Sequence, residues 1–124
     1  MNKCLRTYKK ELYYIDKDGN KILGSHEEIS GDVFGIYGNV SRISGDVSRI
    51  YGDVSRISGD VFGIYGDVSE ISGDVSGIYG DVSRIYGDVS EIHGNIDDAN
   101  LSDEERKKGV TIDQLLIKEE LENL

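Results

Sequence analysis

The chain has 124 residues and a formal net charge of −10, a length that suits one domain. Its single cysteine cannot form an internal disulfide bond, which excludes a disulfide-stabilised secreted scaffold. No apolar run reaches the ~18 residues of a transmembrane helix, and residues 1–15 hold no run long enough for a signal peptide. We therefore expect a cytoplasmic protein without a membrane partner, and the negative charge argues against direct nucleic-acid binding.

The first 29 residues predict an N-terminal cap that contains a β-hairpin. Residues 12–15 are typical of a strand, 18–20 (Asp-Gly-Asn) of a turn, and 21–23 of the returning strand. Residues 23–29 look like a degraded copy of the repeat that follows, with a glycine and an isoleucine at the repeat's positions.

Residues 30–99 divide into ten consecutive heptads with the consensus Ser/Tyr-Gly-Asp-Val-Ser-x-Ile. Glycine occupies the second position in all ten, and valine the fourth position in nine. Such a fixed period defines a repeat architecture. Valine and isoleucine spaced three and four apart are typical of a coiled coil, but the 13 glycines in these 70 residues exclude it, because each glycine lowers helix stability by about 1 kcal/mol relative to alanine.

The heptad instead predicts one short strand and one corner, and hence a β-solenoid. In residues 50–54, alternate side chains point to opposite faces, which places Ile50, Gly52 and Val54 inside. The inward glycine would let opposing backbones approach closely. Serine and tyrosine alternate at the first position with a 14-residue period, which favours two strands per coil. Five coils at a spacing of ~4.8 Å would make a rod of roughly 25 Å, with like side chains stacked in ladders.

The predicted fold is therefore all-β: a heptapeptide-repeat β-solenoid, or β-helix, with an N-terminal hairpin cap and a C-terminal helical cap. In residues 100–124, Ser102 and Glu105 make a capping box for a short helix that Gly109 ends. A second helix begins at residues 111–114, and it either covers the last coil or pairs with a second copy in a homodimer. The leucines of this helix are Leu115, Leu116, Leu121 and Leu124.

Aspartate recurs at the third heptad position and supplies most of the array's negative charge. Stacked coils would place these carboxylates about 4.8 Å apart, with roughly 0.9 kcal/mol of repulsion per neighbouring pair in water. Either each aspartate accepts backbone N–H groups at its corner, or the column is a surface that resembles a row of phosphates and attracts a nucleic-acid-binding protein. The candidate residues are Asp46, Asp53, Asp60, Asp67, Asp74 and Asp81.

Tyrosines form a matching aromatic column of Tyr37, Tyr51, Tyr65 and Tyr79. Exposed rings suit protein binding, whereas rings that stack on one another only stabilise the sheet; both interpretations remain open. Phe34 and Phe62 replace the corner serine, 28 residues apart and each before a glycine. They are either packed into the corner or exposed as anchors.

The sequence contains no pattern that points to catalysis. His26 and His93 lie at opposite ends of the array, without a cysteine or histidine at metal-ligand spacing. No P-loop, dinucleotide fingerprint or G-x-S-x-G elbow occurs, and the array lacks the nonapeptide of calcium-binding β-rolls. We expect no enzymatic activity, no cofactor and no metal site.

The Gly-Asp-Val-Ser-x-Ile array and the segment Ser102–Gly109 resemble short repeat proteins of bacteria and their phages. In physical logic the chain is also similar to pentapeptide-repeat proteins, acidic β-solenoids of which some imitate DNA and inhibit gyrase. It departs from them in its period of seven and in lacking their central leucine. Small acidic phage proteins that block host defence enzymes, including anti-CRISPR proteins, are a second comparison.

These features predict a non-enzymatic binding protein, of a kind that phages encode. Its partner would be a nucleic-acid-handling host enzyme, inhibited through the acidic face of the solenoid. The alternative is a structural or assembly module that oligomerises through its caps.

Overall fold

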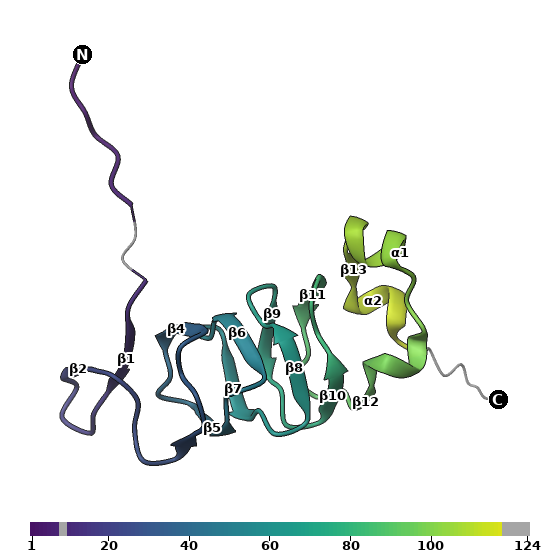
Figure 1. Ribbon diagram of the computed structural model, residues 1–124, viewed down its shortest axis with the longest axis horizontal. Coiled ribbons are helices and arrows are strands. Elements are labelled where there is room, and N and C mark those ends of the chain that lie inside the picture. The colour runs from purple at the N-terminus through teal and green to yellow at the C-terminus, as the bar shows by residue number, and fades with distance from the viewer. Residues whose placement is uncertain (8–9, 118–124) are drawn as a thin grey trace.

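The computed structural model describes residues 1–7 and 10–117. Two sheets run along the long axis of the molecule, coil upon coil, with a hairpin at one end and short helices at the other (Figure 1). Among the described residues, no helix combines the length and the hydropathy needed to cross a membrane. The predicted all-β solenoid with a hairpin cap and a helical cap is confirmed.

The heptads form eight strands of four residues, each running from an isoleucine to the next aspartate or asparagine. These are β4 (Ile36–Asn39), β5 (Ile43–Asp46), β6 (Ile50–Asp53), β7 (Ile57–Asp60), β8 (Ile64–Asp67), β9 (Ile71–Asp74), β10 (Ile78–Asp81) and β11 (Ile85–Asp88). The even-numbered strands lie in one sheet, the tyrosine sheet, and the odd-numbered strands in the other, the serine sheet. Each name refers to the residue after the isoleucine, Tyr86 being the exception in the serine sheet. The prediction of two strands per coil is confirmed.

The regular part of the array has four coils rather than the expected five. The first heptad contributes Ser30 to the two-residue β3 (Ile29–Ser30) and Ile36 to β4, and the last contributes a single short strand, β12 (Gly94–Asn95). The last heptad departs because Asp97 and Ala99 replace the corner serine and the isoleucine, and a 3-10 helix, η1 (Ile96–Ala99), takes the chain off the coil.

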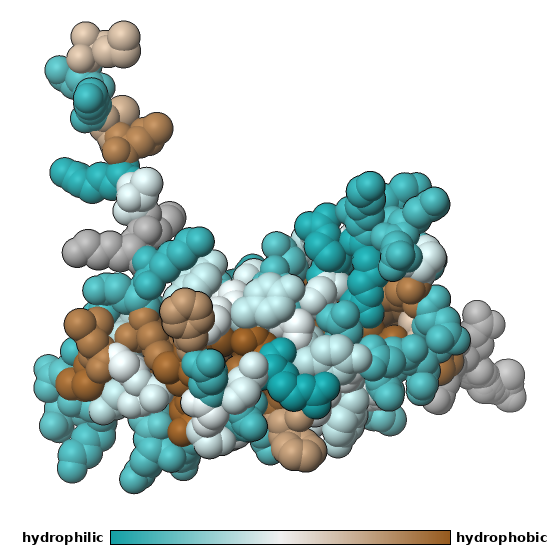
Figure 2. All heavy atoms as spheres, in the orientation of Figure 1, coloured by the Kyte–Doolittle hydropathy of each residue, from teal (hydrophilic) through white to brown (hydrophobic). Residues whose placement is uncertain are grey.

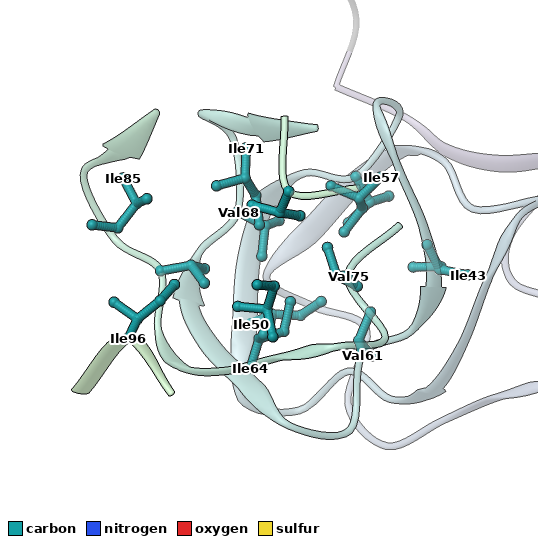
Figure 3. Packing of buried hydrophobic residues seen from close by; sticks show 14 of the residues in the cluster. Ile43, Ile50, Ile57, Val61, Ile64, Val68, Ile71, Val75, Ile85 and Ile96 are labelled. Atoms are coloured by element: carbon teal, nitrogen blue, oxygen red, sulfur yellow. The ribbon is translucent and has the colours of Figure 1, made fainter. Parts of the chain in front are cut away.

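One valine and one isoleucine from each heptad between residues 37 and 85 build most of the core. The valine begins the corner, where its carbonyl accepts the N–H of the isoleucine three residues later, as between Ile43 and Val40 at 3.3 Å. The strand therefore ends at the aspartate, one residue earlier than predicted. Val40 is 0% and Ile43 1% exposed, and Figure 3 shows the isoleucines and valines of successive coils filling a common interior. Burial of each such side chain contributes about 1.5–3 kcal/mol to stability.

The strands of successive coils pair with an offset that differs from the period of the sequence repeat. The Cα partner of Ile36 is Gly52 and that of Tyr37 is Asp53, 16 residues on, although the heptads alternate with a period of 14. The other array pairs in both sheets share this offset. Tyrosine or serine therefore lies opposite aspartate. The prediction that like side chains stack directly opposite one another is wrong, because the offset aligns the aspartate N–H with the hydroxyl of a corner serine of the next coil wherever that corner has one, as for Asp53 and Ser69.

Glycine at the second heptad position has another role than the predicted one. Gly52 has a φ of +103°, a conformation that residues with a Cβ adopt only with strain. A Cβ at this position would also collide with the Ser69 hydroxyl and the Asp67 carboxylate of the next coil. The glycine makes room for a polar corner, not for an opposing backbone.

The N-terminal hairpin closes the first coil. β1 (Leu12–Ile15) and β2 (Lys21–Leu23) pair antiparallel as predicted, and β1 also pairs in parallel with β4. The Ser41 hydroxyl accepts the Ile15 N–H at 2.8 Å, which continues the coil-to-coil contact of the array into the cap.

Two arginines join the C-terminal cap to the last coil. α1 (Asp103–Lys108) begins with the predicted capping box. Arg106 of this helix donates to the carbonyls of Asp81 and Ser83 at 2.9 and 2.6 Å. Arg84 of the last coil donates in return to two carbonyls near the end of α1, at 3.2 and 3.0 Å. The helix is thereby held against the open end of the solenoid.

The second C-terminal helix is shorter than predicted. After β13 (Val110–Thr111), which extends the serine sheet, α2 (Ile112–Leu115) ends because Leu116 has extended backbone angles, φ −71° and ψ 129°. Leu115 packs against the core, as a capping residue would. Leu121 and Leu124, predicted on the same helix, lie outside the described residues.

Two alanine substitutions at glycines of equal φ test whether the corner of the next coil requires a glycine. Gly24 and Gly52 both have φ of +103°, but a Cβ on Gly24 would meet nothing within 4 Å. We expect Gly24→Ala to lower the free energy of unfolding by about 1–3 kcal/mol, and Gly52→Ala to lower it further by about 1 kcal/mol for each corner hydrogen bond that it breaks. Equilibrium denaturation measures both. Equal losses would show that the corner of the next coil does not require the glycine.

Candidate functional site

At each regular corner, the aspartate or asparagine side chain accepts the N–H of the residue two positions later, which is a serine except at Phe34 and Phe62. Asp53 Oδ1 accepts the Ser55 N–H at 2.9 Å, and Asp67 Oδ1 accepts the Ser69 N–H at 2.9 Å. The Ser69 hydroxyl in turn accepts the Asp53 N–H of the preceding coil at 3.1 Å. This side-chain ladder links each coil to the next, each bond contributing about 1 kcal/mol. The interpretation of aspartate as a corner acceptor is confirmed.

The corner hydrogen bonds favour ionised carboxylates. At Asp46 and Asp74, the hydroxyl and then the N–H of the serine two residues later lower the pKa. At Asp88, the N–H of the corresponding serine contributes most to the lowered pKa, followed by its hydroxyl. Donors favour the charged acceptor over the protonated one, so these carboxylates remain charged at neutral pH.

The corner itself does not require a charge. Asn39 occupies one of the aspartate positions, and its Oδ1 accepts the Ser41 N–H at 3.0 Å. Its own N–H donates to the Ser55 hydroxyl at 2.9 Å. Since an uncharged amide makes the same ladder contacts, the carboxylates of the other heptads add a property that corner geometry does not demand.

The coil register divides the predicted aspartates into two groups. In the tyrosine sheet, Asp53, Asp67 and Asp81 lie opposite tyrosines and are half-buried. In the serine sheet, the aspartates lie opposite serines, as Asp60 lies opposite Ser44, and they are exposed, because a serine covers less of its neighbour than a tyrosine ring. We name the exposed row at the corners after the serine-sheet strands the acidic edge. It consists of Asp32, Asp46, Asp60, Asp74 and Asp88.

The two edges of the solenoid also differ in basic residues. On the acidic edge, the residue before each isoleucine is Gly35, Arg49, Gly63, Gly77 or Glu91. On the opposite edge, the corresponding residues are Arg42, Arg56, Glu70 and Arg84. Arginines therefore offset most of the carboxylates on one edge, and the negative charge of the array is concentrated on the other.

The predicted tyrosine column alternates between covered and exposed rings. Lys10 Nζ lies 5.4 Å from the ring centre of Tyr37, and the Arg49 guanidinium lies 4.7 Å from that of Tyr65. The exposed rings are Tyr51 at 51% and Tyr79 at 50%. The predicted binding residues therefore do not form one surface. The tyrosines shield the aspartates of their own sheet, whereas the exposed aspartates belong to the other sheet.

Two phenylalanines interrupt the acidic edge. Phe34 is 93% and Phe62 75% exposed, so neither is packed into its corner, although Asp32 and Asp60 accept their N–H groups at 2.9 and 3.0 Å. Figure 2 shows separate hydrophobic patches on a mainly hydrophilic or neutral surface. Of the two interpretations of these phenylalanines, exposure is the correct one. Neither residue was among the predicted binding residues, although their 28-residue spacing was the available signal.

A hollow of about 380 Å³ lies beside Phe62 and brings together residues from three coils. It is lined by Asp46, Arg49, Phe62, Gly63, Ile64 and Tyr79. Here one of the predicted aspartates and one of the predicted tyrosines do share a surface.

The predicted oligomerisation residues lie partly in the cap. Leu116 is 38% and Ile117 90% exposed, beside a hollow of about 620 Å³ at the C-terminal end that Leu115 also lines. The capping role of Leu115 is supported by its contact with the core, and the homodimer stays a prediction.

No family model matches the chain, and neither a curated protein nor a solved structure matches it. In the part of the chain that the structure describes, no group of three or more His, Cys, Asp or Glu side chains is placed to hold a metal ion.

The lowered pKa values predict acid sensitivity. A carboxyl group whose pKa is lower in the folded state stabilises the fold above its unfolded pKa, which is ordinarily about 3.8 for aspartate. It loses this contribution as the pH falls through the folded pKa. We expect the urea concentration at the midpoint of unfolding to decrease once the pH is lowered below about 4. The variant D46N/D74N/D88N, which keeps the corner acceptor as Asn39 does, should lose less stability between neutral and acidic pH. Identical pH profiles for the two proteins would contradict this.

Proposed function

We propose that the protein is a non-enzymatic inhibitor whose acidic edge binds the basic nucleic-acid-binding surface of a partner enzyme. The single observation that carries this proposal is the row of five exposed aspartates, one per corner, on one edge of the solenoid. Asn39 supports it, because the same ladder contacts form there without a charge.

The acidic edge has the properties that an imitation of a phosphate row requires. Its charges recur at a fixed interval on a rigid scaffold, because each aspartate accepts the N–H of the residue two positions later. This residue is serine at Asp46, Asp74 and Asp88 and phenylalanine at Asp32 and Asp60. A surface that binds nucleic acid is rich in Lys and Arg and gains affinity from neutralising such a regular row. The fixed side chains lose little conformational freedom on binding, which favours affinity.

The arginines on the opposite edge indicate from which side the partner approaches the solenoid. An acidic edge opposite a nearly balanced one creates an electric field across each coil, and complementary fields orient partners before they make contact. The same field disfavours binding through the opposite edge. We therefore expect the partner to approach the corners that follow the serine-sheet strands.

Affinity capture from a bacterial lysate with two matched variants tests this function. D46N/D60N/D74N neutralises three charges of the acidic edge, and D53N/D67N/D81N neutralises three half-buried carboxylates in the tyrosine sheet. Both variants change the net charge by the same amount and keep every corner acceptor. We expect the first variant to lose the partner that the wild type captures and the second to retain it, and we expect added DNA or RNA to displace the partner.

The two matched variants distinguish binding through the acidic edge from an effect of net charge. If both variants retain the partner, the acidic edge does not bind it and the proposed function is wrong. If both lose it equally, net charge rather than the edge determines binding, and the proposal fails as well.

A further inference from the structure

Exposed aromatic rings recur every two coils beside the acidic edge. Phe34 and Phe62 each precede a glycine, and Tyr51 and Tyr79 follow one coil later. All four rings are at least half exposed. We call each Phe-Gly corner with the tyrosine of the next coil an aromatic step.

The glycine of each step leaves room for the tyrosine of the next coil. A Cβ on Gly63 would collide with the ring of Tyr79, and a Cβ on Gly35 would lie 3.1 Å from the Cβ of Tyr51. In the intervening coil, this position is Arg49, and its guanidinium covers the ring of Tyr65. The two steps are therefore the places at this edge where an exposed tyrosine lies beside a glycine of the preceding coil.

Phe62 does not stabilise the solenoid. At the equivalent corners, Ser48 and Ser76 accept the N–H of an aspartate in the preceding coil, at 2.8 and 3.1 Å. Phe62 has no hydroxyl to accept the N–H of Asp46, so the ladder is interrupted there. Since its ring is 75% exposed, burial does not compensate. A residue that weakens the ladder and stays in solvent is expected where it contacts a partner.

From this we infer that the aromatic steps bind Lys or Arg side chains, with a preference for arginine, on the basic surface of the partner. An aromatic face attracts a cation, and an adjacent carboxylate completes the recognition of a guanidinium. At the second step, Asp46 lines the same hollow as Phe62 and Tyr79. At the first step, Asp32 holds the Phe34 N–H at 2.9 Å and is exposed.

The inference rests on the proposed function and specifies it. The acidic edge supplies attraction to any basic surface, whereas the steps would select flat, delocalised cations. Guanidinium groups stack on aromatic rings better than ammonium groups do. The steps lie two strand spacings apart, about 10 Å measured across the strands, so one basic segment can contact both.

Fluorescein-labelled octa-arginine and octa-lysine, followed by fluorescence anisotropy, test the inference on the full chain. We expect the wild type to bind octa-arginine about tenfold more tightly than octa-lysine, from two exposed cation–π contacts. The variant F34S/F62S carries the consensus corner serine, so it should fold with equal or higher thermal stability. It should lose the preference for arginine and about tenfold in affinity for octa-arginine. Weak binding of both peptides to the wild type without a preference would overturn the inference.

A second variant and the lysate experiment separate the remaining outcomes. F34L/F62L keeps apolar side chains but removes two ring faces, and binding equal to wild type would show that cation–π contact is not involved. If F34S/F62S still captures the partner that D46N/D60N/D74N loses, this inference is wrong and the proposed function stands. If D46N/D60N/D74N retains the partner, the proposed function itself is wrong.

Discussion

The structure depends on one contact between coils, the interlock of a corner with the glycine of the coil before it. The corner serine binds both its own aspartate and the N–H of the preceding aspartate, and the space it needs exists because Gly52 and its equivalents have no Cβ. This interlock aligns a residue with its partner 16 positions on. The valine and isoleucine core gives the coils their cohesion, and the interlock gives them their register.

The register explains why the aspartates of one edge are exposed and those of the other are half-buried. Because aspartate lies opposite the first residue of another heptad, the alternation of serine and tyrosine decides which carboxylates are covered. A sequence repeat that looks uniform in charge therefore yields two unlike edges. The chain uses a neutral acceptor at Asn39, on the covered side, so the exposed charges are the ones that call for a functional explanation.

Much of the fold could be predicted from the residues. The glycines excluded a helix, the 14-residue alternation gave two strands per coil, and turn and capping signals located the hairpin and α1. The candidate site was predicted less well. The heptad presents six aspartates as one column, but Asp46 and Asp53 lie on different edges, and strand spacing alone does not reveal a shift in register. The second C-terminal helix was predicted to be too long. It ends before Leu116, where no sequence signal marks the end.

The sequence by itself determined the solenoid, since a strict heptad with two apolar positions and a glycine admits one short strand and one corner per unit. It also determined that the corners are polar and that the array is acidic. The tertiary structure alone decided where that charge is exposed, because exposure depends on which side chain of another coil lies opposite each carboxylate. It likewise decided that Phe34 and Phe62 face solvent, because whether a corner residue packs inward depends on the room that the neighbouring coil leaves.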